Sequence, residues 1–186
     1  MNNIFYKIKK KLFYKFFKKK FSSFEQAKNF CDKISKNSYE NEYLSNYRLE
    51  KFLASINNIN NNKPKSFYFL NKTIEIYQSK FQNNPRILEI GGSFGENCYA
   101  LESINKKDVI FSVLESHKIK ELSIKLKNKI KYYSNLSYAL SEFKPDLIFS
   151  SSTLQYTPNP FEILSTINHY KPKIISFTRN SFSKHT

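Results

Sequence analysis

The chain has 186 residues, of which 40% are hydrophobic, and a formal net charge of +16. This length is enough for one domain with a buried core. The sequence has no run of about 18 apolar residues, so a transmembrane helix is not predicted, and lysines interrupt the N-terminal apolar stretch that a signal peptide would need. The 2 cysteines are too few for a disulfide framework, and we expect a reduced, cytoplasmic protein.

Residues 1–22 form a basic aromatic segment, with eight lysines and no acidic residue among the first 21 positions. Within it, residues 4–21 alternate aromatic and lysine side chains with a partly amphipathic helical spacing. One interpretation is an anchor that lies on an anionic membrane surface, which would place the protein peripherally at the inner face of the membrane. The alternatives are a solvated leader and, less favoured, attraction to nucleic acid.

Residues 23–82 are predicted to form a helical lead-in. Apolar residues recur at helical spacing in three stretches, at 24–36, 39–56 and 64–81. Cys31 falls on the apolar side of the first stretch, so we expect a small core residue there rather than a nucleophile.

Residues 83–186 alternate between short apolar runs and stretches with helical spacing. The runs predict five strands, at 86–90, 109–114, 130–133, 147–150 and 173–177. The stretches between them predict four helices, at 96–104, 117–127, 136–143 and 161–169. Strands that alternate with helices in this way indicate βαβ units around a parallel sheet, an α/β fold whose ligands bind at the carboxyl ends of the strands.

All three glycines of the chain, Gly91, Gly92 and Gly95, fall between the first of these strands and the next helix. A strand, a glycine turn and a helix bring backbone amides and a helix N-terminus against a ligand, and glycine permits positive φ and close approach. Glu115 lies 20 residues after Gly95, at the end of the second strand, where a carboxylate can bind both hydroxyls of a ribose. The sequence therefore predicts a nucleoside-binding site at this edge of the sheet.

The glycine turn reads E-x-G-G-S-x-G and resembles motif I of class I S-adenosylmethionine (SAM)-dependent methyltransferases, an acidic residue followed by G-x-G-x-G. Glu89, Gly91 and Gly95 match this motif, and Ser93 stands where it often has its middle glycine. The segments GGSFG, VLES, SSSTLQYTPNPFEIL and IISFTRNSF are similar to those of a group of bacterial methyltransferases of unassigned substrate, over about residues 24–182. The acid inside the strand disfavours a further candidate, a nicotinamide-dependent oxidoreductase.

The resemblance implies a Rossmann-like sheet of about five strands, in the order 3-2-1-4-5, with SAM bound at the glycine turn. Eight residues are then expected to contact the cofactor: Glu89, Gly91, Gly92, Ser93, Gly95, Glu115, Ser134 and Ser151. Glu89 would bond to turn amides or to the methionine amine of SAM, and Glu115 to its ribose. The loop at 151–156 would face the methyl group, where Gln155 and Tyr156 are catalytic candidates that orient the acceptor or the adenine. The alternative role for both residues is capping and packing of this loop.

We expect the methyl acceptor to be a small molecule or a surface glycan. DNA base methylation is disfavoured because the N/D-P-P-Y motif is missing, and no metal site is predicted because His117, His169 and His185 lack ligand spacing. The family fold ends with an antiparallel strand pair that this sequence lacks, so we expect an open sheet edge that an oligomer partner would cover. The alternative function is an inactive, truncated methyltransferase-fold protein that serves as a binding module at a membrane surface.

Overall fold

The computed structural model describes residues 20–34, 42–56, 58–59, 61–106, 108–126 and 129–181. The chain divides into two compact units, Met1–Ser38 and Tyr39–Thr186. Most of the basic segment predicted at residues 4–21 lies outside the described residues, so its interpretation stays a prediction. Among the described helices, none combines the length and the apolar character needed to cross a membrane.

The first unit contains helix α2 (Phe24–Ile34). Its start is fixed by Ser23, whose Oγ accepts a hydrogen bond from the Gln26 amide at 3.2 Å, as expected of a capping serine. The predicted position of this helix is therefore confirmed. Cys31 is exposed, so the prediction of a core cysteine is wrong. Helical spacing identifies the apolar side of a helix, but it does not supply an element to cover that side.

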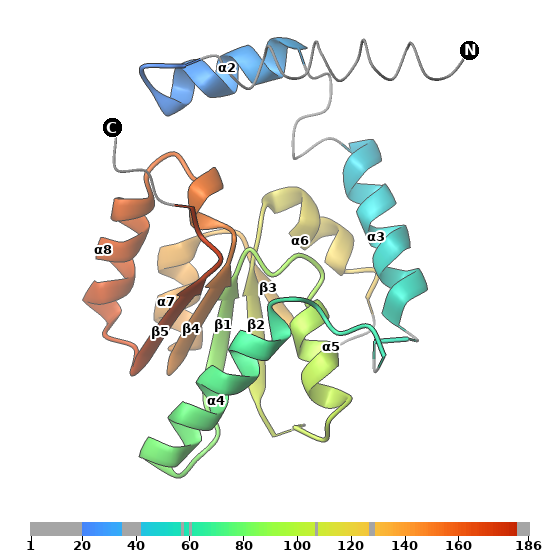
Figure 1. Ribbon diagram of the computed structural model, residues 1–186, viewed down its shortest axis with the longest axis vertical. Helices are drawn as coiled ribbons and strands as arrows, with labels where there is room; N and C mark the ends of the chain where they lie inside the picture. The colour runs from blue at the N-terminus through green and yellow to red at the C-terminus, as the bar shows by residue number, and fades with distance from the viewer. Residues whose placement is uncertain are drawn as a thin grey trace. The chain divides into compact units, whose positions relative to one another are not determined.

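The second unit is built around a five-stranded sheet. Its strands are β1 (Arg86–Ile90), β2 (Ile110–Leu114), β3 (Lys131–Tyr133), β4 (Leu147–Ser151) and β5 (Ile174–Thr178). They are all parallel and pair in the order β3-β2-β1-β4-β5, which confirms the predicted Rossmann-like α/β fold (Figure 1). The strand order changes direction between β1 and β4, which is where ligands bind in open parallel sheets.

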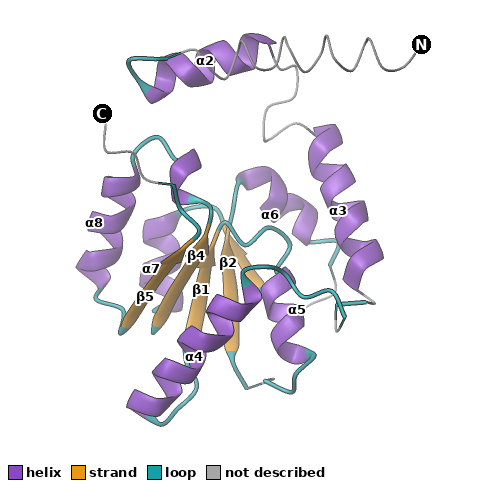
Figure 2. Ribbon diagram, in the orientation of Figure 1, coloured by secondary structure: helices purple, strands orange, loops and turns teal. Residues whose placement is uncertain are grey.

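Helices cover both faces of the sheet (Figure 2). They are α3 (Glu42–Ile56), α4 (Phe67–Phe81), α5 (Glu96–Glu102), α6 (His117–Ser123), α7 (Leu136–Phe143) and α8 (Pro160–Tyr170). Ile87 of β1 belongs to a core cluster with residues of α3 to α6, whereas the next residue, Leu88, packs with residues of α7 and α8. This alternation follows from the pleat of the strand and defines two faces, which we call the α4 face and the α8 face.

Three helices are shorter than the apolar spacing predicts, and one of them is α5, which ends at Glu102 rather than near residue 104. The chain makes a turn at Pro64, whose carbonyl accepts a hydrogen bond from the Phe67 amide at 2.9 Å, and α4 begins only at Phe67. Helix α6 ends at Ser123 rather than near residue 127. A short 3₁₀ helix, η1 (Leu154–Tyr156), lies in the loop after β4 and was not predicted.

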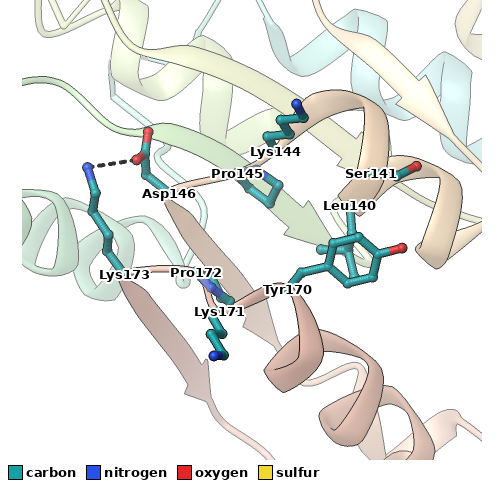
Figure 3. Close-up of a pocket in the computed structure, with 9 residues that line it drawn as sticks. All are labelled: Leu140, Ser141, Lys144, Pro145, Asp146, Tyr170, Lys171, Pro172 and Lys173. Atoms are coloured by element: carbon teal, nitrogen blue, oxygen red, sulfur yellow. Dashed lines mark ion pairs between the residues drawn. The ribbon is translucent and has the colours of Figure 1, made fainter.

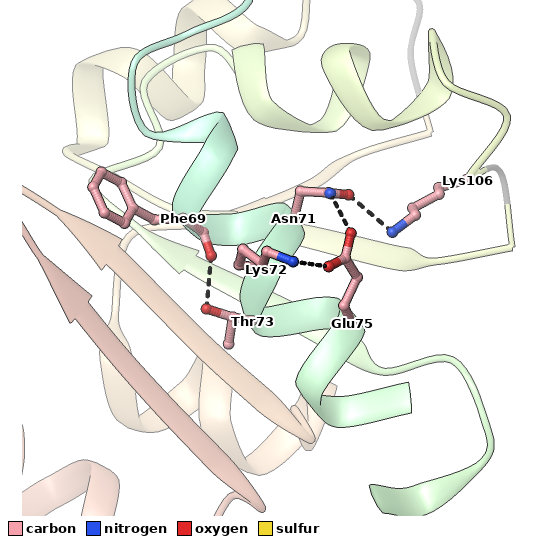
Figure 4. A network of polar contacts seen from close by, with 6 residues as sticks. All are labelled: Phe69, Asn71, Lys72, Thr73, Glu75 and Lys106. Carbon is pink, nitrogen blue, oxygen red and sulfur yellow. Dashed lines mark hydrogen bonds and ion pairs between the residues drawn. The ribbon is translucent and has the colours of Figure 1, made fainter. Parts of the chain in front are cut away.

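A polar network joins α4 to the chain that follows α5 (Figure 4). Asn71 donates to Glu75 at 2.8 Å and accepts a hydrogen bond from Lys106 at 2.8 Å. At the N-terminal end of α4, the Ser66 hydroxyl accepts a hydrogen bond from Asn97 of α5 at 3.0 Å. The contact between Ser66 and Asn97 places the N-terminus of α4 beside the start of α5, at the carboxyl edge of the sheet.

Candidate cofactor site

The glycine turn connects β1 to α5. Gly91 has φ +74° and its amide donates to the Leu114 carbonyl of β2 at 2.8 Å. Gly95 has φ +84°, stands directly before α5, and donates to the Gly92 carbonyl at 2.9 Å. Both backbones are in the left-handed region that favours glycine.

Protein atoms occupy the space beside these glycines. A Cβ on Gly91 would lie 2.1 Å from Oγ1 of Thr153, in the loop after β4, and a Cβ on Gly92 would lie 2.7 Å from Oε2 of Glu89. The sequence predicts glycine here partly for the approach of a cofactor. In the structure, glycine also lets the β4 loop and the Glu89 carboxylate lie directly against the turn.

Glu89 lies in β1 on the α4 face and is 3% exposed. Its Oε1 accepts a hydrogen bond from Asn97 at 2.6 Å, whereas its Oε2 is buried and has no hydrogen-bond partner among the described residues. Burial raises the pKa of Glu89 to about 8, against the opposing effect of the Asn97 hydrogen bond. The structure gives no hydrogen bond from a turn amide to this carboxylate within the described part of the chain, so one oxygen is left to meet a ligand.

Glu115 directly follows β2, and its carboxylate turns toward the glycine turn. Its Oε1 accepts a hydrogen bond from the Ser93 amide at 3.2 Å, and its Oε2 accepts one from the Ser116 amide at 2.7 Å. Each oxygen keeps a further lone pair, since a carboxylate offers about four acceptor positions. This acid therefore lies beside the turn, where the sequence places a ribose-binding residue.

Sequence reasoning missed the contribution of α3 to this site. Nη2 of Arg48 donates to the Ser93 hydroxyl in the turn at 3.3 Å, and its charge also counteracts the rise that burial causes in the pKa of Glu96. Lys51, one helical turn further, lies with its Nζ 5.4 Å from the centre of the Tyr47 ring. Basic residues three or four positions apart are common on the solvated surface of a helix. No sequence signal therefore distinguishes Arg48 and Lys51 from ordinary surface cations.

A cavity of about 660 Å³ lies between α3 and the glycine turn. Five of the predicted cofactor residues line it, namely Glu89, Gly91, Gly92, Ser93 and Ser151. It also has two cations on the α3 side, Arg48 and Lys51, and a second carboxylate, Glu96, on the α5 side. The cavity is therefore lined by carboxylates from β1 and α5 and by cations from α3.

Glu115 does not line this cavity, although it bonds to Ser93, which does, and four other predicted site residues also lie outside it. Gly95 is buried beneath Ile130, and a Cβ on Gly95 would lie 2.4 Å from Cδ1 of Ile130. Ser134 follows β3 and is exposed. Gln155 accepts a hydrogen bond from the Ser181 amide at 2.8 Å, and Tyr156 is 72% exposed. Gln155 thus ties the loop after β4 to the segment after β5.

A second cavity, of about 540 Å³, lies at the opposite edge, where β4 and β5 begin (Figure 3). It lies between the C-terminal ends of α7 and α8, and an ion pair between Asp146 and Lys173 at 2.9 Å closes one side of it. None of the predicted site residues lines it. Parallel sheets bind ligands at the carboxyl edge, so the first cavity is the candidate site.

Comparisons with solved structures find two plantazolicin methyltransferases. BpumL in complex with SAH is 22% identical, with a TM-score of 0.46, over 63% of this chain and 48% of that one. BamL in complex with a triazolic desmethylPZN analogue and SAH is 20% identical, with a TM-score of 0.47, over 65% of this chain and 47% of that one. The chain spans about half the length of these structures. No protein-family model and no curated protein matches the sequence.

Proposed function

We propose that this chain is a SAM-dependent methyltransferase, with SAM bound between the glycine turn and α3. The observation that carries this proposal is the charged lining of the cavity, which combines two carboxylates, Glu89 and Glu96, with two cations of α3, Arg48 and Lys51. An α-amino acid zwitterion has an ammonium and a carboxylate, and it matches this arrangement when its ammonium meets Glu89 and its carboxylate meets the cations.

The same charges disfavour a nicotinamide dinucleotide. Its pyrophosphate could pair with Arg48 and Lys51, but it would offer no cationic partner to Glu89 and Glu96. SAM carries positive charge on its ammonium and on its sulfonium, and so supplies such a partner. Oε2 of Glu89, which has no hydrogen-bond partner among the described residues, supports the same choice, because a ligand ammonium lowers the pKa of this carboxyl and then donates to the ionised oxygen.

The residues of this chain would act by binding and orienting rather than by proton transfer. Glu115 would hold the ribose, Glu89 the α-ammonium, and the α3 cations the α-carboxylate. Bound SAM supplies an electrophilic methyl group. Methyl transfer needs an aligned acceptor and little acid–base chemistry, so positioning can supply most of the rate.

Calorimetric titration of the full chain with SAM, SAH and NADH tests this proposal. We expect SAM and SAH to bind at micromolar concentrations and NADH to show no binding. A folded protein that binds neither SAM nor SAH would refute it, and binding of NADH alone would favour the oxidoreductase. A methyl-transfer assay on small-molecule and glycan acceptors then tests the predicted acceptor class.

Two further predictions concern partners. Strand β5 is the last strand of the sheet, so one of its edges is unpaired within the described residues, and we propose that a second copy of the chain covers it. The oligomeric state by light scattering tests this. For the basic segment at residues 4–21, cosedimentation with anionic and neutral vesicles tests membrane association, which should fade as the salt concentration rises.

A further inference from the structure

Hydrogen bonds connect the N-terminus of α4 to Glu89 in the proposed cofactor site. Nδ2 of Asn97, in the first turn of α5, donates to Oε1 of Glu89 at 2.6 Å and to Oγ of Ser66 at 3.0 Å. Ser66, Asn97 and Glu89 all line the cavity beside the glycine turn. The elements α4, α5 and β1 therefore meet through one amide side chain at the wall of this cavity.

The contact with Asn97 orients the Glu89 carboxyl group. It holds Oε1 on the α5 side, whereas Oε2 lies against the glycine turn, where a Cβ on Gly92 would be 2.7 Å away. Oε2 is buried and has no hydrogen-bond partner among the described residues. A carboxyl group that is held through one oxygen keeps the other oxygen in a fixed position for a donor from a ligand.

Asn97 is itself held in place. Its side chain belongs to a residue that is 4% exposed, and its amide nitrogen donates both to Glu89 and to Ser66. An amide nitrogen has two hydrogens, so its donor capacity is fully used. Rotation of Asn97 away from Glu89 would leave buried polar groups unpaired, which is costly. The orientation of Glu89 therefore depends on contacts that reach α4.

The hydroxyl of Ser66 departs from its usual local role. Ser66 is the N-cap residue of α4, where a serine usually accepts a hydrogen bond from an amide of the first helical turn. No such capping bond forms among the described residues, and the hydroxyl bonds to Asn97 instead. Local preferences are most often given up at functional sites, so this exchange supports a role of the contact in the site.

We propose that Asn97 is a positioning residue of the cofactor site, which holds Oε1 of Glu89 so that Oε2 receives the α-ammonium of SAM or SAH. Ser66 supports Asn97 from the α4 side. This proposal rests on the proposed function, because it assigns the ammonium to Glu89. It distinguishes Asn97 from a residue that only stabilises the fold, since its removal should affect only those ligands that carry the ammonium.

Calorimetric titration of the full chain with SAH, and with an SAH analogue that lacks the α-amino group, tests this role. Asn97→Leu nearly keeps the size of the side chain and removes the donor. We expect it to raise the dissociation constant of SAH about 10-fold, as for the loss of a hydrogen bond to a charged group. The dissociation constant of the analogue should stay within twofold. Equal losses for both ligands, or no loss for either, would overturn the proposal.

Asn71→Leu is the matched control. Asn71 also donates to a glutamate, Glu75, at 2.8 Å, but this pair lies on the exposed surface of α4 and does not line the cavity (Figure 4). We expect this control to leave both dissociation constants within twofold. A loss for SAH as large as in Asn97→Leu would overturn the positioning role.

Ser66→Ala takes the place of Asn97→Leu if that variant does not fold. It keeps the donor to Glu89 and removes only the support from α4, so we expect a smaller rise in the dissociation constant of SAH, of about threefold. The analogue should again bind within twofold of the wild type. An equal effect on both ligands, or none on either, would overturn the proposal in this variant too.

A double substitution separates action through Glu89 from direct contact with the ligand. In a Glu89→Gln background, Asn97→Leu should no longer change the ratio of the two dissociation constants, because the carboxylate through which it acts is gone. A further loss for SAH alone in that background would mean that Asn97 contacts the ligand itself, and would overturn the positioning role.

The outcomes separate the two proposals. Binding of SAH by the wild type, with equal losses for both ligands in Asn97→Leu, would overturn the positioning role and leave the SAM site standing. Absence of SAH binding by the folded wild-type chain would overturn the proposed function together with the role of Asn97.

Discussion

The Glu115 carboxylate accepts a hydrogen bond from the Ser93 amide at 3.2 Å, which ties the end of β2 to the glycine turn after β1. Ser93 is itself held from the other side by Arg48 of α3, at 3.3 Å. The turn is therefore clamped between a carboxylate and a guanidinium from different elements. Such a turn needs little rearrangement when a ligand binds, which favours affinity.

Replacing Glu115 by Gln should weaken SAH binding by about 10- to 100-fold, because hydrogen bonds to a charged group contribute roughly 1.5–3 kcal/mol. Calorimetry gives the dissociation constant. Glu121→Gln, on the exposed surface of α6, makes the same change in net charge and should leave the affinity within twofold. Equal affinities for wild type and Glu115→Gln would contradict a ribose contact.

Removing the charge of Lys51 should weaken the binding of SAH but not of an SAH analogue that lacks the carboxylate. We expect Lys51→Met to raise the dissociation constant of SAH about 10-fold, as for the loss of a charge-assisted contact in a partly exposed site. The dissociation constant of the decarboxylated analogue should not change. Lys65→Met is the matched control, since Lys65 is exposed and does not line the cavity. Losses of equal size for both ligands would assign Lys51 a general electrostatic role instead.

Burial of Glu89 should make the stability of the protein fall as the pH rises. Its pKa is raised from 4.5 to about 8 in the folded chain, so between these values the folded state holds a proton that the unfolded state has lost. The free energy of unfolding therefore decreases through this range and levels off above pH 8, with a total contribution on the order of 5 kcal/mol. Urea unfolding of wild type and Glu89→Gln at pH 5 and pH 8 measures it. We expect the free energy of unfolding of the variant, relative to that of the wild type, to be higher at pH 8 than at pH 5. A difference between the two proteins that does not change with pH would argue against a neutral Glu89.

The same group should couple proton release to SAH binding. An ammonium placed against Glu89 favours the ionised carboxylate and lowers its pKa, so binding near pH 7 should release up to about one proton. Titrations in buffers with different ionisation enthalpies measure this number. Glu89→Gln should release none, and an unchanged proton count in that variant would place the ammonium elsewhere.

Gly91→Ala should destabilise the protein by about 1–3 kcal/mol, because its φ of +74° is unfavourable for alanine and the new methyl would lie 2.1 Å from Oγ1 of Thr153. Chemical unfolding measures the loss. A change below about 0.5 kcal/mol, within the usual range for tolerated surface substitutions, would mean that the β4 loop moves away easily.

The sequence alone determines the fold of the second unit. Five apolar runs alternate with helical stretches, and this alternation allows a parallel sheet to bury both faces, so the strand positions and the α/β class follow from local patterns. The three glycines and Glu115 were also identified in this way, because each has a recognisable place relative to a strand end.

Only the tertiary structure decides which distant side chains meet at the turn. Arg48 and Lys51 precede it by about 40 residues and look like ordinary helix-surface cations until α3 packs beside α5. The position of Ser151 beside Thr178 depends on the pairing of β4 with β5, and the hydrogen bond from Ser152 to the Arg179 carbonyl joins the segments that follow these two strands. Helical and strand periods are local properties, whereas the charge and hydrogen bonding of a site depend on contacts between segments far apart in the chain.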